Sequence, residues 1–169
     1  MTGPTLAAII SRELQAIERE LNAYHTEEQV WQIPSGLPNS AGTLALHAAG
    51  NLQHFVGAVL GGSSYVRDRD AEFNRRDVAR AELIEDLHRA ATSVRETLER
   101  IDRATLEGTY PLPVANRRLV TSDFLTHLAT HLAYHVGQLD FHRRIVTGDA
   151  SGVGTVSPTE LANAQPIQS

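Results

Sequence analysis

Eight histidines stand out in this chain of 169 residues, which contains no cysteine. Three of them, His127, His131 and His135, follow one another at intervals of four, which places them on one face of a helix. Two histidines at positions i and i+4 form a preformed clamp for a metal ion, because both imidazoles project from adjacent turns. His47 and His54 share a helix face in the same way. These histidines are the candidates for metal chemistry.

The remaining histidines have a simpler interpretation. A single histidine in a helix is more often a hydrogen-bonded core or surface residue than a ligand, and we expect this for His25, His88 and His142. His142 lies near the end of a predicted helix, where positive side chains complement the helix dipole. The pair His131 and His135 differs, because burying two imidazoles together without a metal or other partners sacrifices their hydrogen bonds to water.

Two classes of site are excluded by residue type. The zinc-protease pattern HExxH requires a glutamate after its first histidine, and here Leu132 follows His131. The absence of cysteine removes disulfides, thiolate metal ligands and a cysteine nucleophile together. Any metal site must therefore be built from imidazoles and oxygen donors.

Hydrophobic residues spaced by three and four predict four amphipathic helices that would position these histidines. They are expected over residues 6–24, 42–60, 80–101 and 122–147. The predicted fold is an all-α four-helix bundle, in which histidines of the second and fourth helices can face each other. This bundle would occupy residues 1–148.

The connecting segments carry weaker signals. Residues 62–77 alternate acidic and basic side chains without an apolar period, which is typical of a solvated loop. Residues 108–120 contain two prolines and could hold a short pair of strands. The polar composition of residues 149–169 predicts a tail or an extended strap.

Charge and hydropathy limit the partners. The formal net charge of −5 gives no positive field for a phosphate backbone, so nucleic acid is not an expected partner. No apolar run approaches the ~18 to 20 residues of a membrane span, and the first residues lack the basic start of a secretory signal. A cytoplasmic protein without membrane contact is expected.

Two segments resemble a known family. The runs TLALHAAGNLQHFVGAVLGG and THLATHLAYHVGQLDFHRR, which contain the candidate histidines, resemble the DinB-like (YfiT-like) superfamily of metal-dependent proteins. The resemblance covers residues 6–147, and its most specific part is the second HxxxH followed by Gly137 and Gln138. It implies an up-down-down-up four-helix bundle.

The resemblance also implies a ligand set of one histidine from the second helix and two from the fourth. These are His47, His131 and His135. His47 is preferred to His54 because it precedes the turn that contains Gly-Asn. The pair that includes His135 is preferred to the pair that includes His127 because the last ligand of the family lies just before Gly-Gln. Spacing alone permits either choice.

Three neutral imidazoles leave at least one coordination position open, as in catalytic rather than structural zinc sites. We expect zinc or nickel, with iron, manganese or copper as alternatives, because imidazole suits several of these metals. The resemblance implies a transferase that acts on a small-molecule substrate with a low-molecular-weight thiol, which the cysteine-free chain would have to receive from outside.

Two other functions use the same histidines. Metal-dependent hydrolysis is less favoured, because no aspartate or glutamate lies at an obvious spacing from the ligands. Non-catalytic binding of a metal or ligand needs no further residue. Relatives often pair through long helices, so a homodimer is expected. Residues near the ligands that could orient them, without an assigned role, are Asn51, His54, Asp123, Tyr134 and Gln138.

Overall fold

The computed structural model describes residues 2–154, 157–161 and 164–167. Within these residues the chain is all-helical and contains no β-strand, which confirms the predicted all-α class. No helix in this part of the chain is long and apolar enough to cross a membrane. The α-helices are α1 (Gly3–Asn22), α2 (Glu27–Trp31), α3 (Ala41–Leu52), α4 (Arg69–Asn74), α5 (Arg80–Leu98), α6 (Arg103–Glu107) and α7 (Thr121–Thr147).

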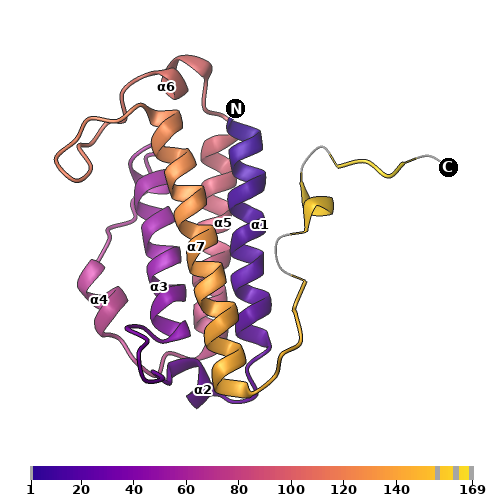
Figure 1. Cartoon of the computed structure of the whole chain (residues 1–169). Coiled ribbons are helices and arrows are strands. Elements are labelled where there is room, and N and C mark those ends of the chain that lie inside the picture. Colours follow the sequence, from indigo (N-terminus) through magenta and orange to yellow (C-terminus); the bar gives the residue numbers. More distant parts are fainter. Residues whose placement is uncertain (1, 155–156, 162–163, 168–169) are drawn as a thin grey trace.

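The four longest helices lie side by side (Figure 1). Helix α1 contacts α5 and α7, and α3 contacts the same two helices. In Figure 1, α1 and α7 run in one direction and α3 and α5 in the opposite direction. The short helices α2, α4 and α6 belong to the connections between the long ones. Helices α3 and α7, which carry the candidate histidines, are therefore neighbours.

The core is made by the apolar stripes that the sequence predicts. Every apolar residue of the stripe on α1 is buried, and so is the stripe on α5, because these faces point into the space between the long helices. The buried stripe residues of these two helices are Leu6, Ile10, Leu14, Ile17, Leu21, Leu83, Leu87, Ala90, Val94 and Leu98.

Helix boundaries differ from the prediction at several places, and α5 ends at Leu98, whereas the predicted helix extends to residue 101. The first predicted helix ends at Asn22, and the buried Tyr24 lies in the turn that follows. Helix α2 then starts at a capping box formed by Thr26 and Gln29. The second predicted helix is continuous, but beyond α3 it becomes a π-helical segment, Gln53–Ala58, beside the site.

The connections also differ in detail. Residues 62–77, expected as a solvated loop, contain α4, which starts at the N-cap Asp68 and buries Glu72. Residues 108–120 hold two isolated β-bridges, Thr109 with Val120 and Val114 with Arg117, in place of a pair of strands. These two segments approach the same side of the helices that carry the histidines (Figure 1).

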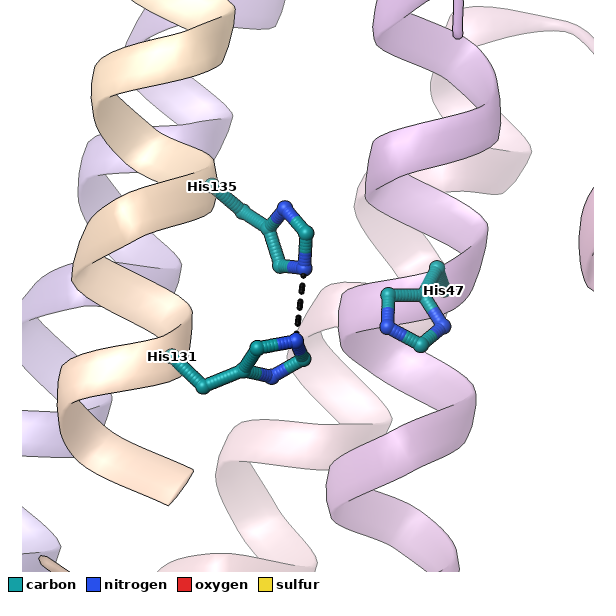
Figure 2. Close-up of side chains that lie close together, drawn as sticks. All are labelled: His47, His131 and His135. Atoms are coloured by element: carbon teal, nitrogen blue, oxygen red, sulfur yellow. Dashed lines mark hydrogen bonds between the residues drawn. The ribbon is translucent and has the colours of Figure 1, made fainter. Parts of the chain in front are cut away.

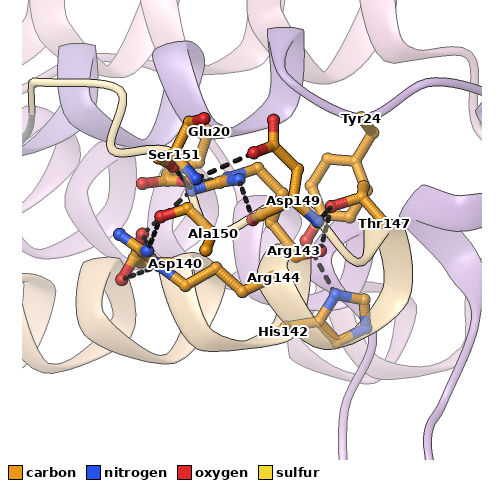
Figure 3. Close-up of polar contacts among 10 residues, drawn as sticks. All are labelled: Glu20, Tyr24, Asp140, His142, Arg143, Arg144, Thr147, Asp149, Ala150 and Ser151. Carbon is orange, nitrogen blue, oxygen red and sulfur yellow. Dashed lines mark hydrogen bonds and ion pairs between the residues drawn. The ribbon is translucent and has the colours of Figure 1, made fainter.

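The end of α7 is tied to α1 by a buried ion pair (Figure 3). Arg143 is fully buried, and its Nε donates to Glu20 of α1 over 2.6 Å. The same guanidinium donates to the backbone oxygens of Asp149 and Ser151, which follow the helix. Helix α7 ends at Gly148, which has a φ of 72° and so adopts the left-handed conformation that glycine tolerates best.

Candidate metal centre

Three histidines from two helices meet on one side of the helix array (Figure 2). His47 comes from α3, and His131 and His135 come from successive turns of α7. One ring nitrogen of each lies within 4.8 Å of the others. His47 and His135 are buried and His131 is half-buried. We call these three residues the histidine group; the structure brings together the three residues predicted as ligands.

The other histidines considered in the sequence lie outside this group. His127 is exposed and stacks on His131, with the ring centroids 5.9 Å apart. His54 packs against Phe55 instead. His142 is buried between the Tyr24 hydroxyl and the backbone oxygen of Gln32, at 2.7 and 2.9 Å from its two ring nitrogens.

Hydrogen bonds define which ring nitrogens are free. His135 Nδ1 lies 2.7 Å from Gln138 Oε1, and His47 Nδ1 lies 3.0 Å from Glu72 Oε2. Both oxygens are acceptors, so each Nδ1 donates a hydrogen to its partner, and Nε2 is the ring nitrogen that remains for a metal. Nε2 of His135 lies 3.0 Å from Nε2 of His131. At this distance, either His131 Nε2 donates a hydrogen to His135 Nε2, or both nitrogens coordinate the same cation.

Glu72 holds His47 from outside the helix array. Its carboxylate is buried and accepts two hydrogen bonds from Arg67, at 2.7 Å on Oε1 and 2.8 Å on Oε2. Burial acts to raise the pKa of Glu72, but the hydrogen bonds from Arg67 and His47 outweigh it and place the pKa below its usual value. Glu72 is therefore an ionised acceptor that fixes the His47 ring, an arrangement common around metal-bound histidines.

Gly50 makes room for this carboxylate. It lies on α3 one turn after His47, and a Cβ built at this position would collide with Glu72 Oε1. Sequence reasoning missed both Glu72 and Arg67, because neither has a helical spacing to the histidines. The small residue on the helix was a signal that another segment could approach closely, although not which one.

The electrostatic surroundings favour neutral imidazoles. Burial lowers the pKa of His131 to about 4, with further contributions from His135, His47, His127 and Arg67. Burial also lowers the pKa of His135. Because a histidine must be neutral to bind a metal, these rings are in the binding form at neutral pH. Three imidazoles, two of them held by hydrogen bonds at Nδ1, fit a divalent transition metal ion.

The histidine group faces a cavity of about 470 Å³, a volume typical of small-molecule sites. The guanidinium of Arg67 lies over the ring of Phe55, and that of Arg69 over the ring of Phe73. Arg69 gives one wall of the cavity a positive character, whereas the charge of Arg67 is offset by Glu72. Other residues of the lining are Asn39, Leu44, Asn51, Val114, Phe124, His127, Leu128, Tyr134 and Gln138.

The comparison with protein families gives one match. Residues 6–158 match the sequence model of a family described as "Protein of unknown function (DUF1572)". The chain belongs to the DUF1572 family. The matched region of this DUF1572 chain includes every helix that supplies or orients the histidine group. No curated protein and no solved structure matches the chain.

The sequence analysis named five residues near the ligands that could orient them. Of these, within the described part of the chain, Gln138 forms a hydrogen bond with the histidine group. Asn51 is buried and lines the cavity. Tyr134 is largely exposed and lines the rim. Asp123 and His54 do not line the cavity.

Proposed function

We propose that this DUF1572 chain binds a divalent transition metal ion through His47, His131 and His135, and acts as a metal-dependent transferase with a low-molecular-weight thiol. The observation that carries the proposal is the approach of three ring nitrogens within 4.8 Å. Glu72 and Gln138 engage Nδ1 of two of the rings and so leave Nε2 free. Zinc and nickel are the first metals to test, followed by iron and manganese.

We further propose that the chain is DinB-like and that its long helices form an up-down-down-up bundle. The opposed directions of the pair α1 and α7 and the pair α3 and α5 support this topology. The order of the ligands along the chain also supports it. One histidine comes from the second long helix, and two come from the fourth, where Gly137 and Gln138 follow directly.

A metal bound here would lower the pKa of a thiol at its open position and so supply a nucleophile. The protein's own residues provide the rest of the site. Glu72 and Gln138 hold two of the rings in place, and Arg69 attracts an anionic ligand into the cavity. Because the chain contains no cysteine, the thiol has to be a separate molecule.

The carboxylate next to the histidine group does not favour hydrolysis. A general base works best with a pKa near the working pH, and despite its burial the hydrogen bonds from Arg67 and His47 hold the pKa of Glu72 below its usual value. Both oxygens of Glu72 accept hydrogen bonds, from Arg67 and His47. Glu72 therefore orients the ring of His47, and we favour the transferase over the hydrolase.

The test is elemental analysis of protein purified without a metal-affinity column, after incubation with zinc, nickel, iron or manganese. We expect about one equivalent of metal in the wild type. His47→Ala, His131→Ala and His135→Ala should lose it, while His127→Ala, the matched control on α7, should retain it. Wild-type protein without metal would contradict the site.

The thiol is tested on the cobalt-substituted protein. A thiol that binds at the metal changes the visible absorption spectrum of cobalt, and we expect this change with at least one low-molecular-weight thiol. Metal binding without any spectral response to thiols would overturn the transferase while leaving the metal site in place.

A further inference from the structure

A second hollow adjoins the histidine cavity. It lies between the segment before α3 and the exposed face of α7, with a volume of about 400 Å³. Asn39, Leu44, Tyr134 and Gln138 line both hollows, so the two adjoin along these residues. We call the second hollow the apolar groove. Its remaining lining residues are Leu37, Pro38, Ala133, Gly137, Phe141 and His142.

The lining of the apolar groove contains no lysine, arginine, aspartate or glutamate. Tyr134 and Phe141 are seven residues apart on α7 and therefore lie on the same face. They are 64% and 69% exposed, which is unusual for two large aromatic side chains. This chemistry contrasts with the histidine cavity, where the charged side chains of Arg67 and Arg69 contribute to the lining.

Gly137 lies between these two aromatic residues on α7, at the floor of the apolar groove. A Cβ at this position would meet no atom within 4 Å, so the space above it is open. Any side chain at position 137 would extend into the groove. The absence of a side chain there is what keeps the groove open along α7.

Gln138 stands where the groove meets the histidine cavity. Its Oε1 accepts the hydrogen bond from His135, which leaves the amide N–H groups as donors at this border. A ligand that passes from one hollow into the other crosses uncharged hydrogen-bonding groups of Gln138 and Asn39. The border therefore suits a neutral acceptor such as a carbonyl oxygen.

We propose that the apolar groove binds the uncharged aromatic part of the ligand whose donor group faces the histidine group. The ligand is thus a small molecule that joins a metal-binding donor to an aromatic body. Binding of the donor group depends on the proposed function, because it requires the metal site. Binding of the aromatic body depends only on the groove. The shared border of the two hollows favours this occupant over a protein partner.

The test compares two probes that share one metal-binding group. Acetohydroxamate carries only that group, and naphthohydroxamate adds an aromatic body. By calorimetry on zinc-loaded protein, we expect naphthohydroxamate to bind at least about tenfold more tightly, because its rings leave water for the groove. Gly137→Leu should remove this advantage and leave acetohydroxamate binding and zinc content unchanged.

Thr130→Leu is the matched control. It adds the same side chain to an exposed position of α7 that lines neither hollow, and it should keep the tenfold advantage. Gly137→Leu is expected to fold, because leucine is the better helix former. Equal affinities for the two probes in the wild type, or equal losses in both variants, would overturn the inference.

A second arm separates this inference from the proposed function. If the wild type takes up none of the four metals, the proposed function is wrong, and the groove is judged by the binding of naphthol to metal-free protein, followed by NMR. Naphthol should then bind the wild type and Thr130→Leu but not Gly137→Leu. If light scattering instead shows a dimer that only Gly137→Leu dissociates, the groove is an interface between copies and the inference is wrong.

Discussion

Glu72 connects the histidine group to a segment outside the long helices. Its carboxylate is the acceptor for His47 Nδ1, and it is itself held by two hydrogen bonds from Arg67. The orientation of His47 therefore depends on a side chain that lies 3.0 Å from its ring and belongs to α4. His135 is oriented differently, by Gln138 from its own helix.

The first prediction follows from this contact. Glu72→Gln keeps the shape of the side chain but removes the charge that His47 and Arg67 share. We expect metal affinity to fall by roughly 10- to 100-fold, as is typical when a carboxylate behind a metal-bound histidine is lost. Competition with a chelator at pH 7 measures the change.

Asp70→Asn is the control for this prediction, because it makes the same chemical change at an exposed position of α4. It should leave the affinity unaltered. If Glu72→Gln binds metal as tightly as Asp70→Asn, then the carboxylate does not support His47 in the metal-bound protein.

The sequence predicted the histidines of the site better than their surroundings. Spacing alone placed His131 and His135 on one helix face, and the family resemblance selected His47 as their partner. Glu72 was not predictable, because its position depends on how residues 62–77 fold back onto α3. Local periodicity carries no information about such a contact between distant segments.

At the scale of elements, the position of α7 against α1 depends on Arg143. This side chain has a relative exposure of 0%, and Glu20, its partner on α1, is equally buried. Asp140 and two backbone oxygens beyond the helix take further N–H groups of the same guanidinium (Figure 3). Arg143 therefore links α7, α1 and the segment that follows α7.

The second prediction concerns this ion pair. Arg143→Ala leaves the charge of Glu20 buried without its partner, and we expect the free energy of unfolding to fall by about 3 to 5 kcal/mol. Urea unfolding of metal-free protein at pH 7 measures it. Arg144→Ala removes a neighbouring arginine that is partly exposed, and should cost about 1 kcal/mol or less.

Replacing both members of the pair distinguishes a lost ion pair from lost packing. The double variant Glu20→Leu with Arg143→Met has no buried charge at these two positions. It should regain much of the stability that Arg143→Ala loses. Similar losses for Arg143→Ala and Arg144→Ala would show instead that burial of the pair is energetically unimportant.

The sequence also predicted elements unevenly. The stripes of apolar residues identified the four long helices, because each must bury one face. The helix α4 was missed, since it is short and buries mainly Glu72, a charged residue that the pattern assigns to solvent. The break after α1 was missed because Tyr24 continues the apolar spacing into a turn.

At the scale of the whole molecule, the neutral histidines couple folding to pH. His131 has a pKa of about 4 in the folded chain, whereas an exposed histidine has a pKa of about 6.5. Between these values the unfolded chain binds a proton that the folded chain does not. The stability contributed by neutral His131 is therefore complete above pH 6.5 and is lost as the pH falls toward 4.

The third prediction is that the free energy of unfolding of metal-free protein decreases between pH 6.5 and pH 4. His131→Asn should reduce the slope by at most about 1.4 kcal/mol per pH unit, the limit for one proton. His25→Asn, at an exposed position, should leave the slope as it is. Urea titrations at several pH values measure it, and equal slopes for His131→Asn and the wild type would refute the assignment.

The close approach of Glu72 to Gly50 has a consequence for related sequences. A Cβ at position 50 would take the space of Glu72 Oε1, so alanine there would push the carboxylate away from His47 and Arg67. In homologues, the two positions should therefore mutate together, and a chain that loses the glycine should also have replaced the glutamate. Pairwise covariation at these sites would thus record, across lineages, a constraint that one structure displays as a single contact.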